Sequence, residues 1–546
     1  MKRFLWLGFV LFIYVICSGC GDTFRPIIIP NPPIFPNPKA AHSVVAINDN
    51  GGAVNGTAMV VDVSGDTDVS VKDVGYAPVH AVQQTANQVL VVNHSASNGQ
   101  ADSITKLNFS STIISGSTTI SLPANSAPSF VAVAPTDTTA YVTLPDYVPD
   151  PINNPGVIVP SIGVVSTQSN NVVATITAGV NPVALAVTPD KSKLYVANQG
   201  DGTVNGFNTV DRSQRVGSPV STTSPPIWLV ARTDNQRVYV LEQAGTLAWL
   251  DTTSTAGPDT FTETAISVPD ATTMVYDSNL NRLYIPGGAQ MAIVDISQSA
   301  PQPLAMIAIP PFPVLPVGSS APATATAAAA LPDGSRAYVA SYAVLPSQFN
   351  VTSVTGDGTT ATYAYSLTAG HDLTPGVSIT VTDTATGFDG TFLVGAMVSG
   401  TAACPGTCFQ APNTTILAAT SVSGSGTGTN IFPQVTVVEV TSNTIKTTVS
   451  IPGFPDATNP STAQYYAQVC APPTPYRATF RFMMAAAGDS SRTYLSSCDG
   501  GNVNLIDTSN DTYIENLPAP ASNSRPPIPP NPLNPPQNPV FLFAGP

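Results

Sequence analysis

Histidine, cysteine and tryptophan are the side chains of this chain that could carry catalysis, metal binding or ligand stacking. The 546-residue sequence holds only four histidines, six cysteines and three tryptophans. They form no Gly-x-Ser-x-Gly nucleophile elbow and no His-Glu-x-x-His zinc motif, and no phosphate-binding loop is present. The segment 198–202, Asn-Gln-Gly-Asp-Gly, lacks the spaced acids and closing glutamate of a calcium loop and is typical of a hairpin turn. We therefore expect no cofactor and no metal.

The charge balance excludes nucleic acid as a partner. The formal net charge is −14 with only 19 lysines and arginines, whereas a protein that binds a phosphate backbone needs a basic surface. Hydrophobic residues make up 43 % of the chain and charged residues 10 %, which is not the composition of a disordered protein. Together with 40 glycines and 53 prolines, this composition favours an all-β fold with many turns.

The first forty residues are typical of a targeting signal followed by a tether. Lys2 and Arg3 precede an apolar run over 4–16, which is shorter than a membrane-spanning helix and fits a signal peptide. Residues 20–40 are rich in proline, which favours an extended chain. We expect this segment to hold a folded body away from a membrane, or to be a leader without a spacing role.

A lipidation motif separates the two segments. Cys17-Ser18-Gly19-Cys20 resembles the lipobox of bacterial lipoproteins, which implies that 1–19 is a signal peptide and that Cys20 receives the lipid. Gly21 in the next position resembles the pattern of outer-membrane sorting. The resemblance implies a bacterial cell-envelope protein that contacts the membrane through a lipid anchor, with the outer membrane favoured, or a secreted one. Ordinary signal cleavage and an uncleaved anchor are the alternatives.

The rest of the chain contains an internal repeat with a period near 45 residues. In the clearest copy, a proline opens an apolar strand at 182–187, a polar turn follows, and the next strand contains Tyr195-Val196-Ala197-Asn198. Four short strands at such a period are typical of a propeller blade. Proline is tolerated at the first position of a strand, where no ladder donor is needed. The equivalent central positions are Val45, Leu90, Tyr141, Tyr195, Tyr239, Tyr284, Tyr338 and Tyr494.

Two of these copies carry a recognisable motif. Tyr141-Val142-Thr143 and Tyr195-Val196-Ala197-Asn198 resemble the name-giving motif of the YVTN/YncE-like β-propeller family. The resemblance covers 41–348 and 432–546. It implies a propeller in a secreted or envelope protein and no particular activity, because that family's functions are diverse.

The chain ends suggest how the ring closes. The first repeat begins at the central strand, 44–48, without a preceding apolar strand, whereas residues 538–543 match the inner strand of the 182–187 copy. We therefore expect the C-terminal strand to pair with the first repeat and to remove an exposed sheet edge. This arrangement predicts eight blades, with seven as the alternative.

Long insertions are expected on one face of the propeller. With strands a to d counted from the axis outward, the b–c and d–a connections share a face, and the long excursions fall there; they are 144–160, 299–321, 349–431, 452–475 and 518–537. The largest, 349–431, is rich in Thr, Gly and Ser and resembles a small β module inserted in bacterial and phage surface proteins. Binding residues favour loops held on a rigid scaffold. Simple packing over the blade tops is the alternative.

The blade assignment also places the cysteines. Four remain after Cys17 leaves with the signal peptide and Cys20 takes the lipid, and disulfides persist in exported proteins. Cys404 and Cys408 are spaced to close a tight loop at a hairpin tip. Cys470 is expected in a d–a loop and Cys498 at the end of a b strand, on the same face, so we pair them.

Three further residues could contact a ligand in the axial channel. His80 is expected to open an inner strand and His94 to end a b strand, so that the two could approach one another near the axis. Trp228 is expected on an inner strand, where its ring could stack on a sugar. Packing within the fold is the alternative interpretation of each.

The sequence therefore predicts an all-β lipoprotein with an eight-bladed propeller, at 41–348 and 432–546, and an inserted β module at 349–431. We expect a non-enzymatic binding or scaffold role, with a protein or a glycan at the cell envelope bound by the loop-rich face. The alternative is a propeller enzyme that acts on a small molecule, either lactonase-like or quinoprotein-like. A structural surface-layer component is a third possibility.

Overall fold

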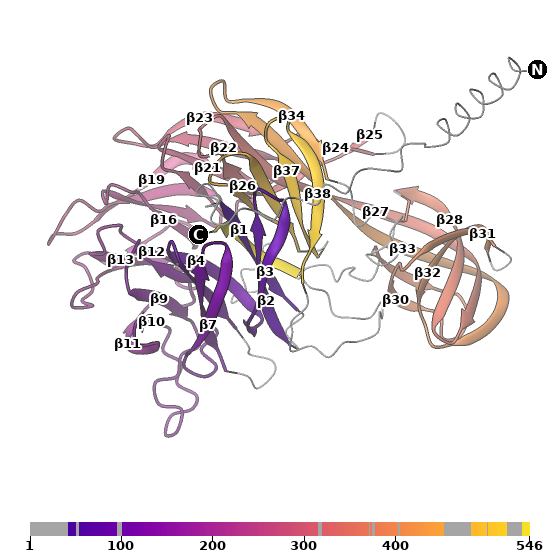
Figure 1. Ribbon diagram of the computed structural model, residues 1–546, viewed down its shortest axis with the longest axis horizontal. Helices are drawn as coiled ribbons and strands as arrows, with labels where there is room; N and C mark the ends of the chain where they lie inside the picture. Colours follow the sequence, from indigo (N-terminus) through magenta and orange to yellow (C-terminus); the bar gives the residue numbers. More distant parts are fainter. Residues whose placement is uncertain are drawn as a thin grey trace, which may run out of the picture. The chain divides into compact units, whose positions relative to one another are not determined.

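The computed structural model describes residues 42–50, 54–94, 101–314, 319–370, 372–373, 377–401, 404–451, 482–498, 501–520 and 538–545. The chain divides into two units, Met1–Ala40 and Ala41–Pro546, and the described residues belong to the second. All named elements in it are β-strands, and they form eight sheets around a ring and one short additional hairpin. The predicted eight-bladed, all-β propeller is confirmed (Figure 1).

The first four blades are antiparallel four-stranded sheets, described from the inner strand outward. Blade 1 is β39 (Asn538–Ala544), β1 (Ser43–Asp49), β2 (Asn55–Asp62) and β3 (Thr67–Tyr76). Blade 2 is β4 (Pro78–Thr85), β5 (Gln88–Asn93), β6 (Ser103–Ser110) and β7 (Ile113–Ser121). Blade 3 is β8 (Val131–Val133), β9 (Thr139–Leu144), β10 (Ser161–Ser166) and β11 (Asn171–Thr177). Blade 4 is β12 (Pro182–Val187), β13 (Lys193–Asn198), β14 (Thr203–Asn208) and β15 (Val220–Ser221).

The other four blades follow the same order. Blade 5 is β16 (Pro226–Ala231), β17 (Arg237–Glu242), β18 (Thr246–Asp251) and β19 (Thr260–Ser267). Blade 6 is β20 (Val275–Asp277), β21 (Arg282–Gly287), β22 (Gln290–Asp295) and β23 (Gln302–Ala308). Blade 7 is β26 (Thr324–Ala330), β27 (Arg336–Asp357), β33 (Ile416–Glu439) and β34 (Thr444–Ser450). Blade 8 is β35 (Phe482–Ala486), β36 (Arg492–Ser497), β37 (Asn502–Asp507) and β38 (Thr512–Pro518).

The C-terminal strand closes the ring as predicted. β39 is antiparallel to β1, with Val45 opposite Phe543 and Ile47 opposite Phe541. It is therefore the inner strand of blade 1, and it leaves β1 with a partner on both sides. Closure removes the sheet edge that an unpaired β1 would expose.

Between neighbouring blades lies a continuous hydrophobic core. Alternate residues of the same strand face opposite neighbours; in β17, Val238 and Val240 pack toward blade 4, whereas Tyr239 and Leu241 pack toward blade 6. Because both faces of a blade are covered, the central strands are apolar at successive positions rather than alternately polar. This explains why each repeat contains a continuous apolar run.

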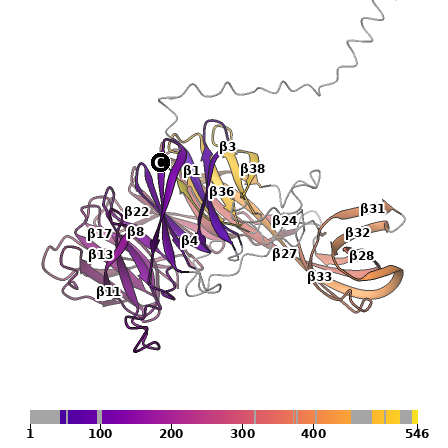
Figure 2. The ribbon, with the colours of Figure 1, turned by 60° about the horizontal axis from the view of Figure 1, so that its bottom comes forward.

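The inserted module is one sheet with blade 7. β27 and β33 pair from Arg336 opposite Glu439 to Asp357 opposite Ile416, so both strands run through the expected boundaries at 349 and 431 (Figure 2). The module adds β28 (Thr360–Gly370), β29 (Ser378–Thr382), β30 (Gly390–Leu393), β31 (Met397–Thr401) and β32 (Cys404–Pro412). It has a core of its own around Phe349, Tyr363 and Phe409.

One expected excursion is shorter than its predicted bounds. The segment 299–321 contains β23, the outer strand of blade 6, and the hairpin β24 (Phe312–Val314) and β25 (Ser319–Ala321). Gln302 pairs with Asp295, so the d strand begins where the sequence pattern predicted a loop. Most of 452–475 and 518–537 lies outside the described residues.

Basic side chains in five blades join each of these blades to the next. The repeat pattern described above did not include them. In five blades a lysine or arginine stands two residues before the tyrosine of the b strand, and it reaches the c–d turn of the next blade. Lys193 Nζ donates to Ser254 O at 2.8 Å, and Arg282 Nη1 donates to Val440 O at 2.9 Å. The other members are Arg237, Arg336 and Arg492, which contact Gln298, Asp511 and Asp66 respectively. The sequence signal is Lys/Arg-x-Tyr, repeated at blade spacing.

Candidate binding face

The propeller face that carries the b–c and d–a connections is named the loop-rich face, and on blade 3 it presents three exposed apolar residues in one loop. The connection between β9 and β10, residues 145–160, is named the blade-3 loop. Ile152 is 88 % exposed, Val157 55 % and Ile158 53 %. Val180, in the d–a connection that follows, is 54 % exposed. Single exposed apolar residues are ordinary, and three of them on one loop make this loop the candidate binding site of the face.

Internal hydrogen bonds hold the blade-3 loop in shape. Val159 N donates to Tyr147 O at 2.8 Å, which closes the loop at its base. At its tip, Asp150 Oδ1 accepts from Asn153 N at 3.0 Å, and hydrogen bonds from Asn153 lower the pKa of Asp150. Tyr147 packs against the core between blades 2 and 3. The apolar side chains are thus presented on a fixed loop, with little ordering left to lose on binding.

Aromatic side chains from four inner-strand segments pack together around His80. The His80 ring stacks on Phe130 at 3.9 Å between centroids and contacts Phe541 at 4.6 Å. Trp228 meets Phe130 edge to face at 5.4 Å. Burial lowers the pKa of His80 to about 3, so its ring is neutral, and Nδ1 accepts a hydrogen bond from Val131 N at 3.4 Å. His80 and Trp228 both belong to this packed cluster.

His94 has a different partner. Its Nδ1 lies 3.4 Å from Asp102 Oδ1, and both side chains are buried. Asp102 Oδ2 accepts from Ser126 N at 2.8 Å and Ala127 N at 3.2 Å, which fixes the connection leading to β8. The contacts of His80 and His94 are therefore separate, and the described contacts do not bring these two histidines together.

The structure describes three of the cysteines that the sequence assigned to disulfides. Cys404 and Cys408 form a disulfide at the start of β32, beside its turn from β31. Cys498 is buried and disulfide-bonded. Cys470 and Cys20 lie outside the described residues, so the pairing of Cys470 with Cys498 and the lipidation of Cys20 stay predictions.

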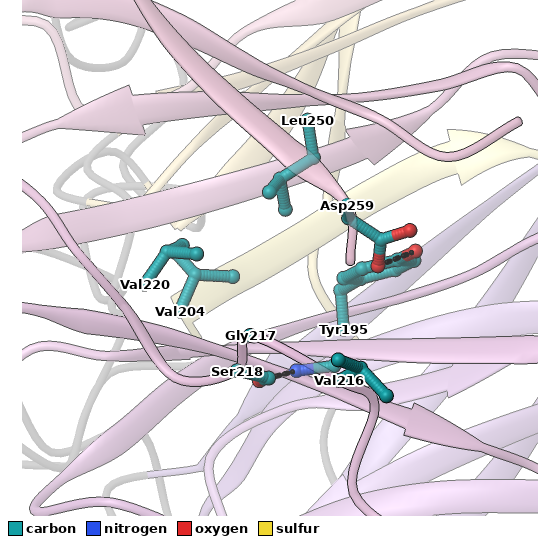
Figure 3. Close-up of a pocket in the computed structure, with 9 residues that line it drawn as sticks. Tyr195, Val204, Val216, Gly217, Ser218, Val220, Leu250 and Asp259 are labelled. Atoms are coloured by element: carbon teal, nitrogen blue, oxygen red, sulfur yellow. Dashed lines mark hydrogen bonds between the residues drawn. The ribbon is translucent and has the colours of Figure 1, made fainter. Parts of the chain in front are cut away.

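A small cleft between blades 4 and 5 is filled by structural contacts (Figure 3). Asp259 accepts from Tyr195 Oη at 2.8 Å and from Arg215 Nε at 2.7 Å and Nη2 at 2.8 Å. Burial, reinforced by Asp259, raises the pKa of Tyr195. The remaining space is about 10 Å³, which is at most a single water. This site joins two blades and is too small to hold a ligand.

Metal-binding clusters and membrane-spanning helices are both missing from the part of the chain that the structure describes. Within it, His, Cys, Asp and Glu do not form any group of three or more that could hold a metal ion. The same residues contain no helix with the length and hydropathy needed to cross a membrane.

Comparisons with known proteins bear on the fold alone. No family model matches the chain, and no curated protein matches it. Apo AztD from Citrobacter koseri is similar at 9 % identity and a TM-score of 0.49, over 92 % of this chain and 98 % of that one. A putative 6-phosphogluconolactonase from Bacteroides fragilis is similar at 12 % identity and a TM-score of 0.38, over 55 % of this chain and 90 % of that one. Hydrazine synthase from Kuenenia stuttgartiensis is similar at 14 % identity and a TM-score of 0.35, over 49 % of this chain and 76 % of that one. At such values the likeness carries no argument about activity.

Proposed function

We propose that this chain is a lipid-anchored propeller of the YVTN/YncE-like type that binds another protein at the bacterial cell envelope through its loop-rich face. The observation that carries the proposal is the blade-3 loop, on which Ile152, Val157 and Ile158 are exposed while backbone hydrogen bonds fix the loop. Apolar side chains gain free energy when another apolar surface covers them. They offer no hydrogen bonds to a sugar, so a protein fits this loop better than a glycan.

The packed cluster of aromatic side chains around His80 favours a binding role over the enzymatic alternative. A propeller enzyme gathers acids, histidine or arginine at one end of the axial channel. Here the described inner-strand residues around His80 are Phe130, Trp228 and Phe541. His80 is only 4 % exposed, and its Nδ1 already accepts a hydrogen bond from Val131 N, so this ring serves packing.

Replacing the three exposed residues of the blade-3 loop by serine (Ile152→Ser, Val157→Ser, Ile158→Ser) should weaken partner capture. The expected loss is at least 10-fold, because about 1.4 kcal/mol of lost apolar contact already gives that factor. The measurement is crosslinking on intact cells followed by identification of the captured proteins, with the melting temperature as a check of folding.

Val210→Ser is the matched control. Val210 is 93 % exposed but lies in the c–d connection of blade 4, on the opposite face. It should capture the same partner as the wild type. Equal capture by the triple variant would remove the blade-3 loop from the proposal, and capture of glycan in place of protein would overturn the choice of partner.

Lipid anchoring has a test of its own. Cys20→Ser should move the protein from the membrane fraction to the soluble fraction, because a chain without its lipid loses the hydrophobic anchor. Cys17→Ser is the control and should stay with the membrane. A Cys20→Ser protein that remains in the membrane fraction would point to an uncleaved signal anchor.

A further inference from the structure

The position three residues after the central residue, at the end of the b strand, is occupied by different residues in different blades. Asparagine stands there in blades 1, 2 and 4, and its Nδ2 donates to the c strand. Asn93 donates to Thr105 Oγ1 at 3.1 Å and Asn198 to Asn205 Oδ1 at 2.6 Å. In blade 5 the position is Glu242, which is 0 % exposed. A carboxylate cannot donate, so Glu242 needs a different partner.

The c strand of blade 5 does not provide that partner. Ala248 pairs with Val240 as Asn205 pairs with Val196, so alanine replaces the polar residue. The small side chain leaves room toward the d strand, where Glu263 stands opposite Ala248. A longer acid at the b-strand end therefore faces a second acid across the blade.

Two consecutive residues of the d–a connection bind the two carboxylates. Ser224 N donates to Glu242 Oε2 at 2.9 Å, and Thr223 N donates to Glu263 Oε1 at 3.0 Å. Thr223 Oγ1 also donates to Glu263 Oε2 at 2.8 Å. Adjacent backbone groups can reach both carboxylates only when these lie side by side. Glu242 Oε1 is buried and has no hydrogen-bond partner among the described residues.

No basic side chain on the neighbouring described elements lies close enough to offset the negative charges of Glu242 and Glu263. The connection 222–225 is Thr-Thr-Ser-Pro, and β16 has no charged residue. On β17 and β18 the charged side chains are Arg237 and Asp251, at the far ends of those strands. Asp270, in the turn of blade 6 that adjoins Gly245, is itself acidic. Burial, followed by the charge of Glu263, raises the pKa of Glu242 to about 7.

We propose that Glu242 and Glu263 share one proton, and that this acid pair clamps the 222–225 connection of the loop-rich face in a pH-dependent manner. The proton sits on Glu242 Oε1 and is donated to a carboxylate oxygen of Glu263, which gives the orphan oxygen its hydrogen bond. A base in solvent removes it as the pH rises. Two adjacent carboxylates then remain, one of them buried. Burial and the charge of Glu263 raise the pKa of Glu242, and the hydrogen bond from Ser224 N, which favours the ionised form, opposes them. Repulsion then drives the two carboxylates apart, and the neighbouring residues Thr223 and Ser224 can no longer hold both.

The test compares the pH dependence of unfolding in the wild type and Glu242→Gln. The pKa of Glu242 in the folded state lies above its ordinary value of 4.5, so its contribution to stability is complete below about pH 4.5 and is lost as the pH rises through about 7. The wild-type folding equilibrium constant should fall on the order of 100-fold over this range from this group. The fall should be absent in Glu242→Gln, whose amide donates permanently.

Glu515→Gln is the matched control, because Glu515 is an exposed glutamate on the d strand of blade 8; it should keep the wild-type profile. The protection factor of the Ser224 amide, which corrects for base-catalysed intrinsic exchange, should fall as the pH rises through 7 in the wild type and not in Glu242→Gln. A wild-type profile in Glu242→Gln would overturn the proposal. Stabilisation of the wild type, but not of Glu242→Gln, by calcium chloride at pH 8 would overturn it too, in favour of a bound cation.

Discussion

A chain that ends at residue 537 should fail to form the closed propeller. The missing strand, β39, carries Val540, Phe541 and Leu542, all of which are buried between blades. Removing three such side chains costs about 5–8 kcal/mol, which is comparable to the entire stability of an ordinary domain. It also leaves β1 as an unpaired edge, and exposed edges promote association of chains. Size-exclusion chromatography and far-UV circular dichroism should show aggregated or unfolded protein.

Deleting only Gly545 and Pro546 is the control for this truncation, because all of β39 remains. This shorter deletion should leave a protein with the wild-type elution volume and nearly the wild-type melting temperature. If the chain ending at 537 were equally stable, the ring would not need β39, and blade 1 would be a sheet of three strands.

The second large effect is expected at the junction of blades 4 and 5. Asp259→Asn should destabilise the protein by about 3–5 kcal/mol, because it leaves the Arg215 guanidinium buried without its counter-charge. The side chains of this pair are only 2 % and 7 % exposed, with Nε and Oδ2 2.7 Å apart. Urea unfolding at neutral pH measures the change as a shift of the midpoint at constant slope.

A second aspartate–arginine pair gives the comparison. Arg232 and Asp234 are also 2.7 Å apart, but the Asp234 side chain is 41 % exposed. Asp234→Asn should therefore cost less than about 1 kcal/mol, as surface pairs do. Equal losses in the two variants would mean that burial does not decide the strength of the blade 4–5 junction.

The repeat was predictable because most blades share a local residue pattern. Tyr195-Val196-Ala197-Asn198 forms a central strand, and a terminal aspartate caps the c–d turn. Asp251 Oδ1, for example, accepts from Thr253 N at 3.0 Å. The apolar segment 538–543 was assigned to blade 1 because it matches the inner strand of another blade, and β39 does pair with β1. Patterns of this kind need only the identity of neighbouring residues.

Contacts between distant residues were not predictable in the same way. The stacking of His80 on Phe130 depends on which side chains of two inner strands point toward each other, and strand periodicity does not specify this. Glu242 shows the opposite case, because its signal was present in the sequence. It stands where Asn198 stands in the preceding copy, and a comparison of all eight copies at that position would have singled it out.

The shared sheet of blade 7 and the inserted module has a mechanical consequence. β27 and β33 are joined by one antiparallel ladder from Arg336–Glu439 to Asp357–Ile416, without an intervening linker. A pull on the module along these strands is carried into the ring by the flanking ladders that β27 forms with β26 and β33 forms with β34. Bonds loaded in parallel share the force, whereas bonds opened in sequence break singly. Tension applied to the module is therefore transmitted directly to the strands of blade 7.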